Sequence, residues 1–271
     1  RRNDGLGETQ ENGTAAETSD AAVRRTGYRL SPPGGDADGA NARDDADSSL
    51  SASIPLQEHT MTAPTRALVL VDIQQEYFSG PLTIQYPAPT DSLPRIIAAI
   101  DAAEANGIPV VVVQHTSGDD APVFNPTLPG FALHPEIEQR RTPAWKAVTK
   151  QYGSVFAHTD LAEWLRQNGI TTVALVGYMT NNCIIASAAE AETLGITAEV
   201  LSDATGAISI SNDAGHVDAE TVHTTLMAVL NSNFAAVAST DAWVTALAEG
   251  HALRKDNLPA SAQSGADRFS R

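Results

Sequence analysis

The chain is poor in cysteine and contains no long apolar segment. Cys183 is the only cysteine among its 271 residues. One thiol cannot form an internal disulfide or a zinc site built from several thiolates, so we expect a reducing, cytoplasmic environment. No apolar run reaches the roughly 20 residues of a membrane-spanning helix, and no charged stretch followed by an apolar one marks a secretory signal. We therefore expect no membrane partner.

Basic residues are also scarce. The chain has 17 Lys and Arg against 33 Asp and Glu, which gives a formal net charge of −16. Nucleic-acid binding depends on basic patches, so this balance argues against a nucleic-acid partner. Long-range attraction of a cationic small molecule is one interpretation of the acidity, and simple solubility is the more ordinary one.

Composition divides the chain into three parts. Residues 1–60 are rich in small, polar and charged residues without a sustained apolar period, which predicts a disordered N-terminal extension. Met61 precedes the first apolar run, and one hypothesis is that natural translation starts there. Residues 61–250 are the predicted folded domain, and residues 251–271 are a predicted flexible C-terminal tail.

The folded domain alternates strands with helices. Short apolar runs predict buried strands, and helical spacing that stops at Asn-Gly or Gly predicts the helices between them. The expected strands are 67–71, 109–113, 172–176, 198–201 and 235–238, and the expected helices are 91–106, 159–168, 182–194, 216–231 and 240–249. This alternation predicts an α/β domain whose mainly parallel sheet has helices on both faces. Sites in such sheets lie beyond the carboxyl ends of the strands.

Cys183 lies at the entrance of the helix predicted over 182–194. Thr180, Asn181 and Asn182, which are good capping residues, come directly before it. The free N–H groups of a helix N-terminus stabilise a thiolate, so one interpretation of Cys183 is a reactive nucleophile. The other is a buried, inert cysteine that packs as a small apolar side chain.

Asp72 and Lys150 are the candidate partners of this thiol. Asp72 directly follows the first strand, where an aspartate acts as a general base or simply ends the strand. Lys150 lies in a strand-like segment over 146–156. It can keep Asp72 ionised and stabilise negative charge at the cysteine, or it can be an ordinary surface lysine.

The sequences around these three residues resemble the isochorismatase-like cysteine hydrolases over about residues 66–247. The matching words are Leu-Val-Asp72-Ile-Gln74, Lys150 followed by Gly-Ser-Val-Phe156, Gly177-Tyr-Met-Thr180-Asn-Asn-Cys183-Ile, Ala188-Ala-Glu-Ala191 before Leu194-Gly195, and Leu201-Ser-Asp203-Ala204. The resemblance implies a three-layer αβα fold with a mainly parallel, six-stranded, Rossmann-like sheet. It also implies a catalytic triad of Asp72, Lys150 and Cys183, a non-proline cis peptide between Tyr178 and Met179, and an oxyanion hole formed by the backbone N–H groups of Met179 and Cys183.

The activity that this resemblance implies is hydrolysis of a small amide through a thioester, with no cofactor. In that scheme Asp72 deprotonates Cys183, the thiolate attacks the amide carbonyl, and the amine leaves with a proton from Asp72. Water then hydrolyses the thioester. Members of the family commonly form homo-oligomers, so we expect a homo-oligomer here as well.

The identity of the amide is less constrained. Nicotinamidases of this family hold a metal with an Asp-x-His pair after the second strand, whereas the residue two places before His115 here is Val113. We therefore predict no metal, and nicotinamide is a weaker candidate. The stretches 74–82, 145–156 and 176–183 are most similar to the streptothricin hydrolases, which open the lactam of a polycationic antibiotic. An amidase for another small amide, or a non-catalytic ligand-binding member of the fold, remains an alternative.

Eight side chains near the triad segments are candidates for contact with the substrate. They are Gln74, Tyr77, Phe78, His115, Trp145, Tyr152, Tyr178 and Asn182. Aromatic walls with a few polar groups suit a small ligand, although ordinary packing explains each aromatic residue equally well. Of the histidines, His115 is the best placed for a role in the site because it follows a strand at the expected edge.

Overall fold

The computed structural model describes residues 63–270. The extension predicted for residues 1–60 and the hypothesised start at Met61 lie outside the described residues. Six strands form one parallel sheet in the order β3-β2-β1-β4-β5-β8. Their bounds are β1 Arg66–Val71, β2 Val110–His115, β3 Lys146–Lys150, β4 Thr172–Tyr178, β5 Thr197–Gly206 and β8 Ala236–Ala238. The predicted six-stranded α/β sheet is confirmed.

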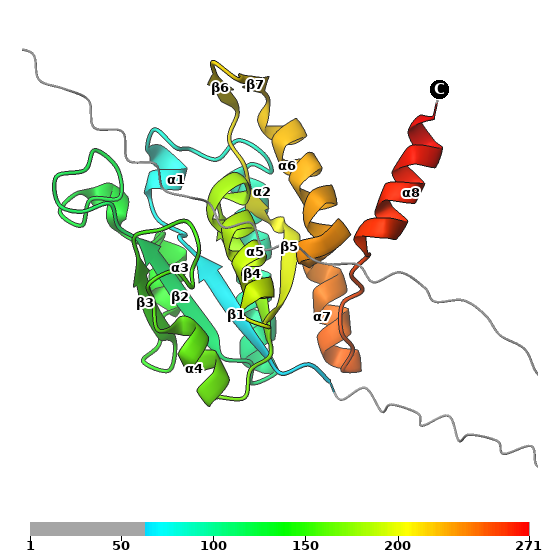
Figure 1. Ribbon diagram of the computed structural model, residues 1–271. Helices are drawn as coiled ribbons and strands as arrows, with labels where there is room; N and C mark the ends of the chain where they lie inside the picture. The colour runs from blue at the N-terminus through cyan, green and yellow to red at the C-terminus, as the bar shows by residue number, and fades with distance from the viewer. Residues whose placement is uncertain (1–62, 271) are drawn as a thin grey trace, which may run out of the picture. The chain divides into compact units, whose positions relative to one another are not determined.

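Helices cover both faces of this sheet (Figure 1). The α-helices of the described residues are α1 Glu76–Ser79, α2 Pro89–Ala105, α3 Pro135–Arg140, α4 Leu161–Gln167, α5 Ile185–Thr193, α6 Ala219–Val229, α7 Thr240–Glu249 and α8 Leu258–Phe269. The last of these, α8, lies apart from the sheet and buries none of its residues. A 3-10 turn, η1, covers Pro129–Phe131, and two π-helical turns cover Thr180–Ile184 (η2) and Leu230–Phe234 (η3). None of the helices within residues 63–270 has the length and apolar character needed to cross a membrane.

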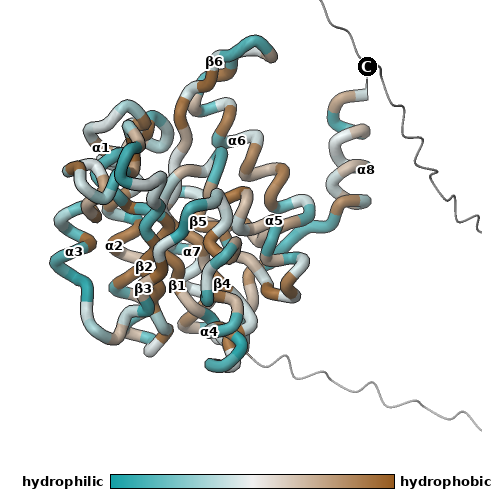
Figure 2. Tube along the Cα trace, turned by 60° about the vertical axis from the view of Figure 1, so that its left-hand side comes forward, coloured by the Kyte–Doolittle hydropathy of each residue, from teal (hydrophilic) through white to brown (hydrophobic). Residues whose placement is uncertain are grey.

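The β1 strand shows why both faces must be covered. Leu68 and Leu70 pack into the cluster that contains the buried face of α2, while Val69 and Val71 pack into the cluster that contains α4 and α5. All four side chains are fully buried, and each such burial contributes roughly 1.5–3 kcal/mol. A strand buried on both sides must read as a continuous apolar run, which is how this one appears in Figure 2.

The path of the chain creates a crevice beside β1. From β1 the chain builds outward through β2 to β3, and then returns to place β4 on the other side of β1. In doubly wound sheets, ligands bind at the carboxyl ends of the strands where the order reverses in this way. The segments that follow β1 and β4 therefore share the expected position of a site.

Gly177 allows the ends of β1 and β4 to come together. It pairs with Val71, the last residue of β1, and its φ of 103° lies in a region that other residues rarely adopt. A Cβ atom at this position would lie 2.2 Å from the Val71 carbonyl oxygen. Only glycine fits this approach, which places the end of β4 next to Asp72.

Three parts of the structure differ from the sequence predictions. The segment 251–271, predicted as a flexible tail, contains the α8 helix, which begins at an Asn257 cap whose side chain accepts from the Ala260 N–H (2.9 Å). A short hairpin of β6 Ile210–Asn212 and β7 Gly215–Val217 occupies what was expected to be a loop and a helix start. The helix predicted over 182–194 begins as the π-helical turn η2. Such irregular turns have no distinct apolar period.

Candidate active site

The three predicted catalytic side chains meet at the carboxyl edge of the sheet. Asp72 directly follows β1, Lys150 is the last residue of β3, and Cys183 lies in η2, the turn that follows β4. Their exposed fractions are 0, 1 and 2%, so all three are buried. Buried charged groups are rare unless they are paired, which makes this cluster an exceptional part of the core.

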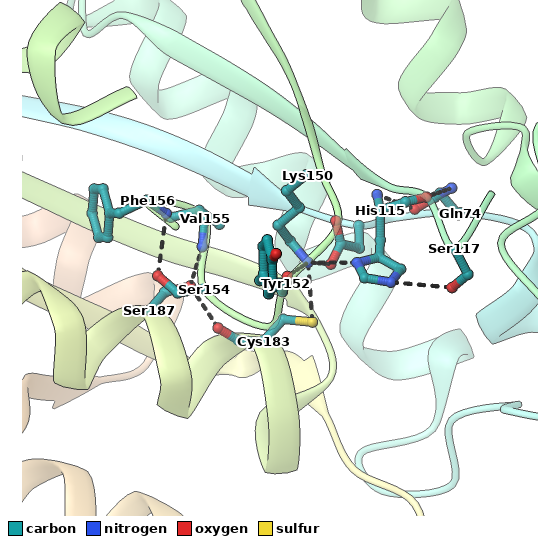
Figure 3. Close-up of polar contacts among 11 residues, drawn as sticks. Gln74, His115, Ser117, Lys150, Tyr152, Ser154, Val155, Phe156, Cys183 and Ser187 are labelled. Carbon is teal, nitrogen blue, oxygen red and sulfur yellow. Dashed lines mark hydrogen bonds and ion pairs between the residues drawn. The ribbon is translucent and has the colours of Figure 1, made fainter. Parts of the chain in front are cut away.

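Lys150 is the centre of the cluster (Figure 3). Its Nζ lies 2.7 Å from Asp72 Oδ2 and 3.3 Å from Cys183 Sγ. The same nitrogen lies 3.2 Å from His115 Nδ1 and donates to the Tyr152 carbonyl at 3.1 Å. An ammonium has three protons, so four acceptors compete for it. Lys150 therefore connects Asp72, Cys183 and His115, the last residue of β2, in one network.

Asp72 combines a strained backbone conformation with a buried carboxylate that has no hydrogen-bond partner within residues 63–270. Its φ of 49° is left-handed, a conformation that costs a residue other than glycine roughly 1–3 kcal/mol. Within the described residues neither of its carboxylate oxygens accepts a hydrogen bond, although Oδ2 lies 2.7 Å from Lys150 Nζ in the ion pair. Burial raises the pKa of Asp72, and the ion pair with Lys150 offsets part of that rise. The carboxylate is therefore an unusually good proton acceptor for an aspartate.

Cys183 is a thiol rather than a free thiolate in the resting site. Burial, followed by the negative charge of Asp72, raises the pKa of Cys183 to about 12, and Lys150 offsets only part of this rise. These effects outweigh the stabilisation of a thiolate that we expected from the helix entrance. A nucleophilic role for Cys183 therefore requires that the thiol lose its proton during the reaction, and Asp72 is the predicted acceptor.

The turn before the nucleophile has the features expected of an oxyanion site. The Tyr178–Met179 peptide is cis, as the family resemblance implies. The Met179 carbonyl accepts from the N–H groups of Asn182 (3.1 Å) and Ile184 (3.2 Å), and within residues 63–270 no backbone oxygen accepts from the Met179 N–H. This N–H and that of Cys183 are the groups we predict to hold an oxyanion.

His115 and Gln74 support Lys150. The Gln74 side chain accepts from the His115 N–H (2.8 Å) and donates to the carbonyl groups of His115 (3.1 Å) and Phe131 (2.8 Å). All polar atoms of Gln74 are thus engaged inside the protein, and it positions His115 rather than facing a ligand. Burial, followed by the charge of Lys150, lowers the pKa of His115 to about 4. The imidazole is therefore neutral, and its Nδ1 accepts from Lys150.

Three of the predicted aromatic residues pack together beside the triad. Tyr178 lies 5.7 Å from Tyr77 and 5.6 Å from Phe78, measured between ring centres. The Tyr178 hydroxyl turns away and bonds Ser92 on α2 at 2.8 Å. Burial, followed by the charges of Cys183 and Asp72, raises the pKa of Tyr77 well above its usual range. Tyr77 therefore keeps its proton and can donate a hydrogen bond near the nucleophile.

Phe124 belongs to the same wall and was not among the predicted residues. Its ring lies 5.3 Å from that of Tyr77 and 5.0 Å from that of His115. It comes from the segment between β2 and α3, which has no periodic pattern, and its φ is 51°. A lone aromatic residue in an irregular loop carries no sequence signal for its contacts.

The remaining candidates lie at the margin of the site or outside it. Trp145 precedes β3, five residues and about 16 Å of strand before Lys150, and its indole donates to Glu104 at 3.1 Å. It does not line the site. Tyr152 is exposed, stacks on His158 with ring centres 5.0 Å apart, and borders a hollow of about 400 Å³ lined by Thr116, Ser117, Gln151 and Tyr152. Asn182 is also exposed.

No metal-binding cluster accompanies these residues in the part of the chain that the structure describes. Over 63–270, no three His, Cys, Asp or Glu side chains gather in a way that could hold a metal ion. At the place where an aspartate ligand would be needed, two residues before His115, the Val113 side chain is fully buried in the core. These residues do not fit a metal site of the kind considered for nicotinamidases.

The fold and this site define a class: a parallel α/β protein with a buried Asp–Lys–Cys cluster at its topological switch point. The sequence model of the Isochorismatase domain matches residues 66–242, and the chain belongs to the isochorismatase family of hydrolases.

Individual relatives differ in how far they match. A crystal structure from Burkholderia xenovorans LB400 is 41% identical, covers 78% of this chain and 100% of its own, and has a TM-score of 0.75. The uncharacterized isochorismatase family protein YrdC of Bacillus subtilis is 28% identical over 69% of this chain and 98% of its own. A streptothricin hydrolase of Streptomyces noursei is 31% identical over 52% of this chain and 58% of its own. The resemblance to streptothricin hydrolases is thus less complete than the sequence words suggested.

Proposed function

We propose that the protein hydrolyses a small amide through a thioester on Cys183. The observation that carries this proposal is the position of Lys150 Nζ, within bonding distance of both Asp72 Oδ2 (2.7 Å) and Cys183 Sγ (3.3 Å) in a buried site. A base, a thiol and a fixed positive charge in contact are the groups that nucleophilic acyl transfer requires.

The first half of the reaction forms the thioester. The Cys183 thiol gives its proton to Asp72 as sulfur attacks the amide carbonyl, so a C–S bond forms and the carbonyl oxygen becomes an oxyanion. The N–H groups of Met179 and Cys183 stabilise that oxygen, and one such donor typically contributes about 2.7–4 kcal/mol. The C–N bond then breaks, and the proton on Asp72 passes to the leaving amine.

The second half regenerates the thiol. A water molecule gives a proton to Asp72 and attacks the thioester carbonyl, and the same N–H groups hold the second oxyanion. The C–S bond breaks to release a carboxylic acid, and the proton on Asp72 returns to the sulfur. Lys150 remains charged throughout and limits the cost of the negative charge that moves between Asp72 and Cys183.

A cationic cyclic amide of the streptothricin type is our candidate substrate. Residues 61–250 contain 20 Asp and Glu and 7 Lys and Arg, a net charge of −13, which attracts a polycation through long-range electrostatics. The partial match to a streptothricin hydrolase supports the same choice. A different small amide satisfies the triad equally well, because the triad acts on the carbonyl and not on the ring.

The test is a panel of linear amides and lactams, with streptothricin included, assayed with the wild type and Cys183→Ala. We expect Cys183→Ala to lose turnover by a factor on the order of 10⁴ or more, while its circular dichroism spectrum is unchanged. Thr193→Ala, at the exposed far end of α5, is the matched control and should retain full activity. Full turnover by Cys183→Ala would overturn the proposal.

A further inference from the structure

A second buried polar chain lies behind the nucleophile turn. Thr180 Oγ1 lies 3.0 Å from His223 Nδ1 and 3.1 Å from Thr205 Oγ1. Thr180 belongs to η2, Thr205 to β5 and His223 to α6. Both threonines are fully buried and His223 is 4% exposed. This chain of hydrogen bonds is separate from the Lys150 network and connects the turn η2 to β5 and α6.

The direction of each hydrogen bond in this chain follows from the tautomer of His223. The Ser202 backbone hydrogen-bonds the imidazole and favours its protonated form, as a carbonyl acceptor does. Burial, the larger effect, lowers the pKa of His223, so the ring is neutral near pH 7. A neutral imidazole has one N–H and one acceptor nitrogen, and we assign the N–H to Nε2 and the acceptor role to Nδ1, the atom that faces Thr180. The Thr180 hydroxyl must then donate to His223 and accept from Thr205.

The bond between Thr180 and His223 anchors the first residue of the turn, while Asn181 Oδ1 accepts from the Ile208 N–H (3.4 Å) and Ser187 Oγ donates to the Cys183 carbonyl (2.6 Å) further along. The first residue of η2 has no side-chain cap, since Met179 at the N-cap position provides none. Thr180 directly follows Met179 and precedes Cys183 by three residues. Fixing the Thr180 side chain therefore fixes the backbone between the two N–H groups that we assign to the oxyanion hole.

We propose that His223 is a positioning residue that acts through Thr180 to align the oxyanion hole. The inference rests on the proposed function, because it assumes that Cys183 is acylated. It predicts that His223 matters when an oxyanion forms and matters little for the nucleophilicity of the sulfur. A purely structural histidine, packed at 5.7 Å against Tyr86, would show no such distinction.

Two reagents that react at Cys183 separate these roles. 4-Nitrophenyl acetate acylates the thiol through a tetrahedral oxyanion, whereas iodoacetamide alkylates it by displacement without one. The rate of each reaction is measured by mass spectrometry of the Cys183 peptide. His223→Leu removes the acceptor, and His223→Asn retains an oxygen near the position of Nδ1. His216→Ala, an exposed histidine in the β6–β7 hairpin, is the matched control.

We expect His223→Leu to slow acylation about 10-fold, less than the roughly 10²–10³-fold lost when an oxyanion donor is removed outright. Alkylation should change by about 2-fold or less, and His223→Asn should recover most of the acylation rate. Should His223→Leu fail to fold, Thr180→Val breaks the same hydrogen bond from the other side and Thr180→Ser retains it.

Parallel losses in both reactions, or no loss in either, would overturn the positioning role. Failure of the wild-type Cys183 to be acylated at all would instead contradict the proposed function, and the inference with it. The two failures are therefore distinguishable in one experiment.

Discussion

Two buried ion pairs lie at opposite ends of β1 and differ in how completely they are satisfied. At the amino end, Arg66 Nε and Nη2 bind the two carboxylate oxygens of Glu199 at 2.9 and 2.8 Å. Trp243 donates to the same carboxylate at 2.9 Å, and Arg66 donates to the His251 carbonyl at 2.6 Å. Both charged side chains are almost completely buried, and each is surrounded by partners.

At the carboxyl end, the pair of Asp72 and Lys150 is left incomplete. Neither carboxylate oxygen of Asp72 accepts a hydrogen bond within residues 63–270, and the Lys150 ammonium that lies 2.7 Å from Oδ2 has three further acceptors around it. The backbone of Asp72 adds a left-handed conformation. A saturated pair holds the fold, whereas an unsaturated pair retains the capacity to accept a proton. The contrast assigns stability to one end of β1 and chemistry to the other.

Breaking each pair with an isosteric amide tests this assignment most strongly. Asp72→Asn should reduce hydrolysis by roughly 10²–10⁴-fold, because it removes the general base. Glu199→Gln should instead lower the free energy of unfolding by about 3–5 kcal/mol, because it leaves Arg66 buried without a counter-ion. Urea unfolding and initial rates on the folded protein measure both. Loss of activity in Glu199→Gln with unchanged stability would reverse the assignment.

The pH dependence of hydrolysis tests the protonation of Asp72 in its incomplete pair with Lys150. Asp72 acts as base only when ionised, and burial raises its pKa, so activity is full above the raised value and falls as the pH drops through it. We expect kcat/KM to decline about tenfold per pH unit below an inflection that lies above the ~3.9 of an ordinary aspartate. His115, with a pKa of about 4, is neutral above that pH and becomes protonated only below it. An inflection at or below the ordinary value would contradict an unsatisfied, buried base.

The proximity of Asp72, Lys150 and Cys183 was predictable from the sequence, because residues at the carboxyl ends of parallel strands all lie at the same edge of the sheet. Asp72, Lys150 and Cys183 come from segments up to 111 positions apart, and the sheet order brings them together. The direction of side chains was less predictable. Gln74 looked like a substrate contact and is engaged by backbone groups, and Trp145 belongs to the wrong end of its strand.

Other features depend on geometry that no periodic pattern encodes. The π-helical start of the nucleophile helix and the position of Phe124 both come from irregular segments. The network of Thr180 and His223 joins residues 43 positions apart. The predicted homo-oligomer and reducing compartment stay predictions.

Removing the neutral acceptor beside Lys150 should have a smaller effect than removing the base. His115→Ala removes one of the acceptors that hold the Lys150 ammonium in position. Because the ammonium is then less precisely placed, we expect about a tenfold loss of kcat. His115→Asn keeps an acceptor near the position of Nδ1 and should lose less. Steady-state kinetics at pH 7 distinguish the two variants. Equal losses in both would show that the ring itself, rather than its acceptor atom, is required.

Substitution of Trp145 should have the smallest effect, and it tests whether this side chain contacts the substrate. Trp145→Phe removes the hydrogen bond to Glu104 and should lower the free energy of unfolding by roughly 1 kcal/mol. KM and kcat should be unchanged, because the side chain lies at the amino end of β3. A raised KM in this variant would show instead that Trp145 contributes to substrate binding.

The central claim is that an acyl group passes through Cys183. A single turnover of a hydrolysable amide, quenched in acid and digested, allows the mass of the Cys183 peptide to be measured over time. We predict a transient increase by the mass of the acyl part of the substrate, which appears before the free acid and disappears with it. An accumulation of free acid with a Cys183 peptide that stays unmodified at every time point would contradict the account.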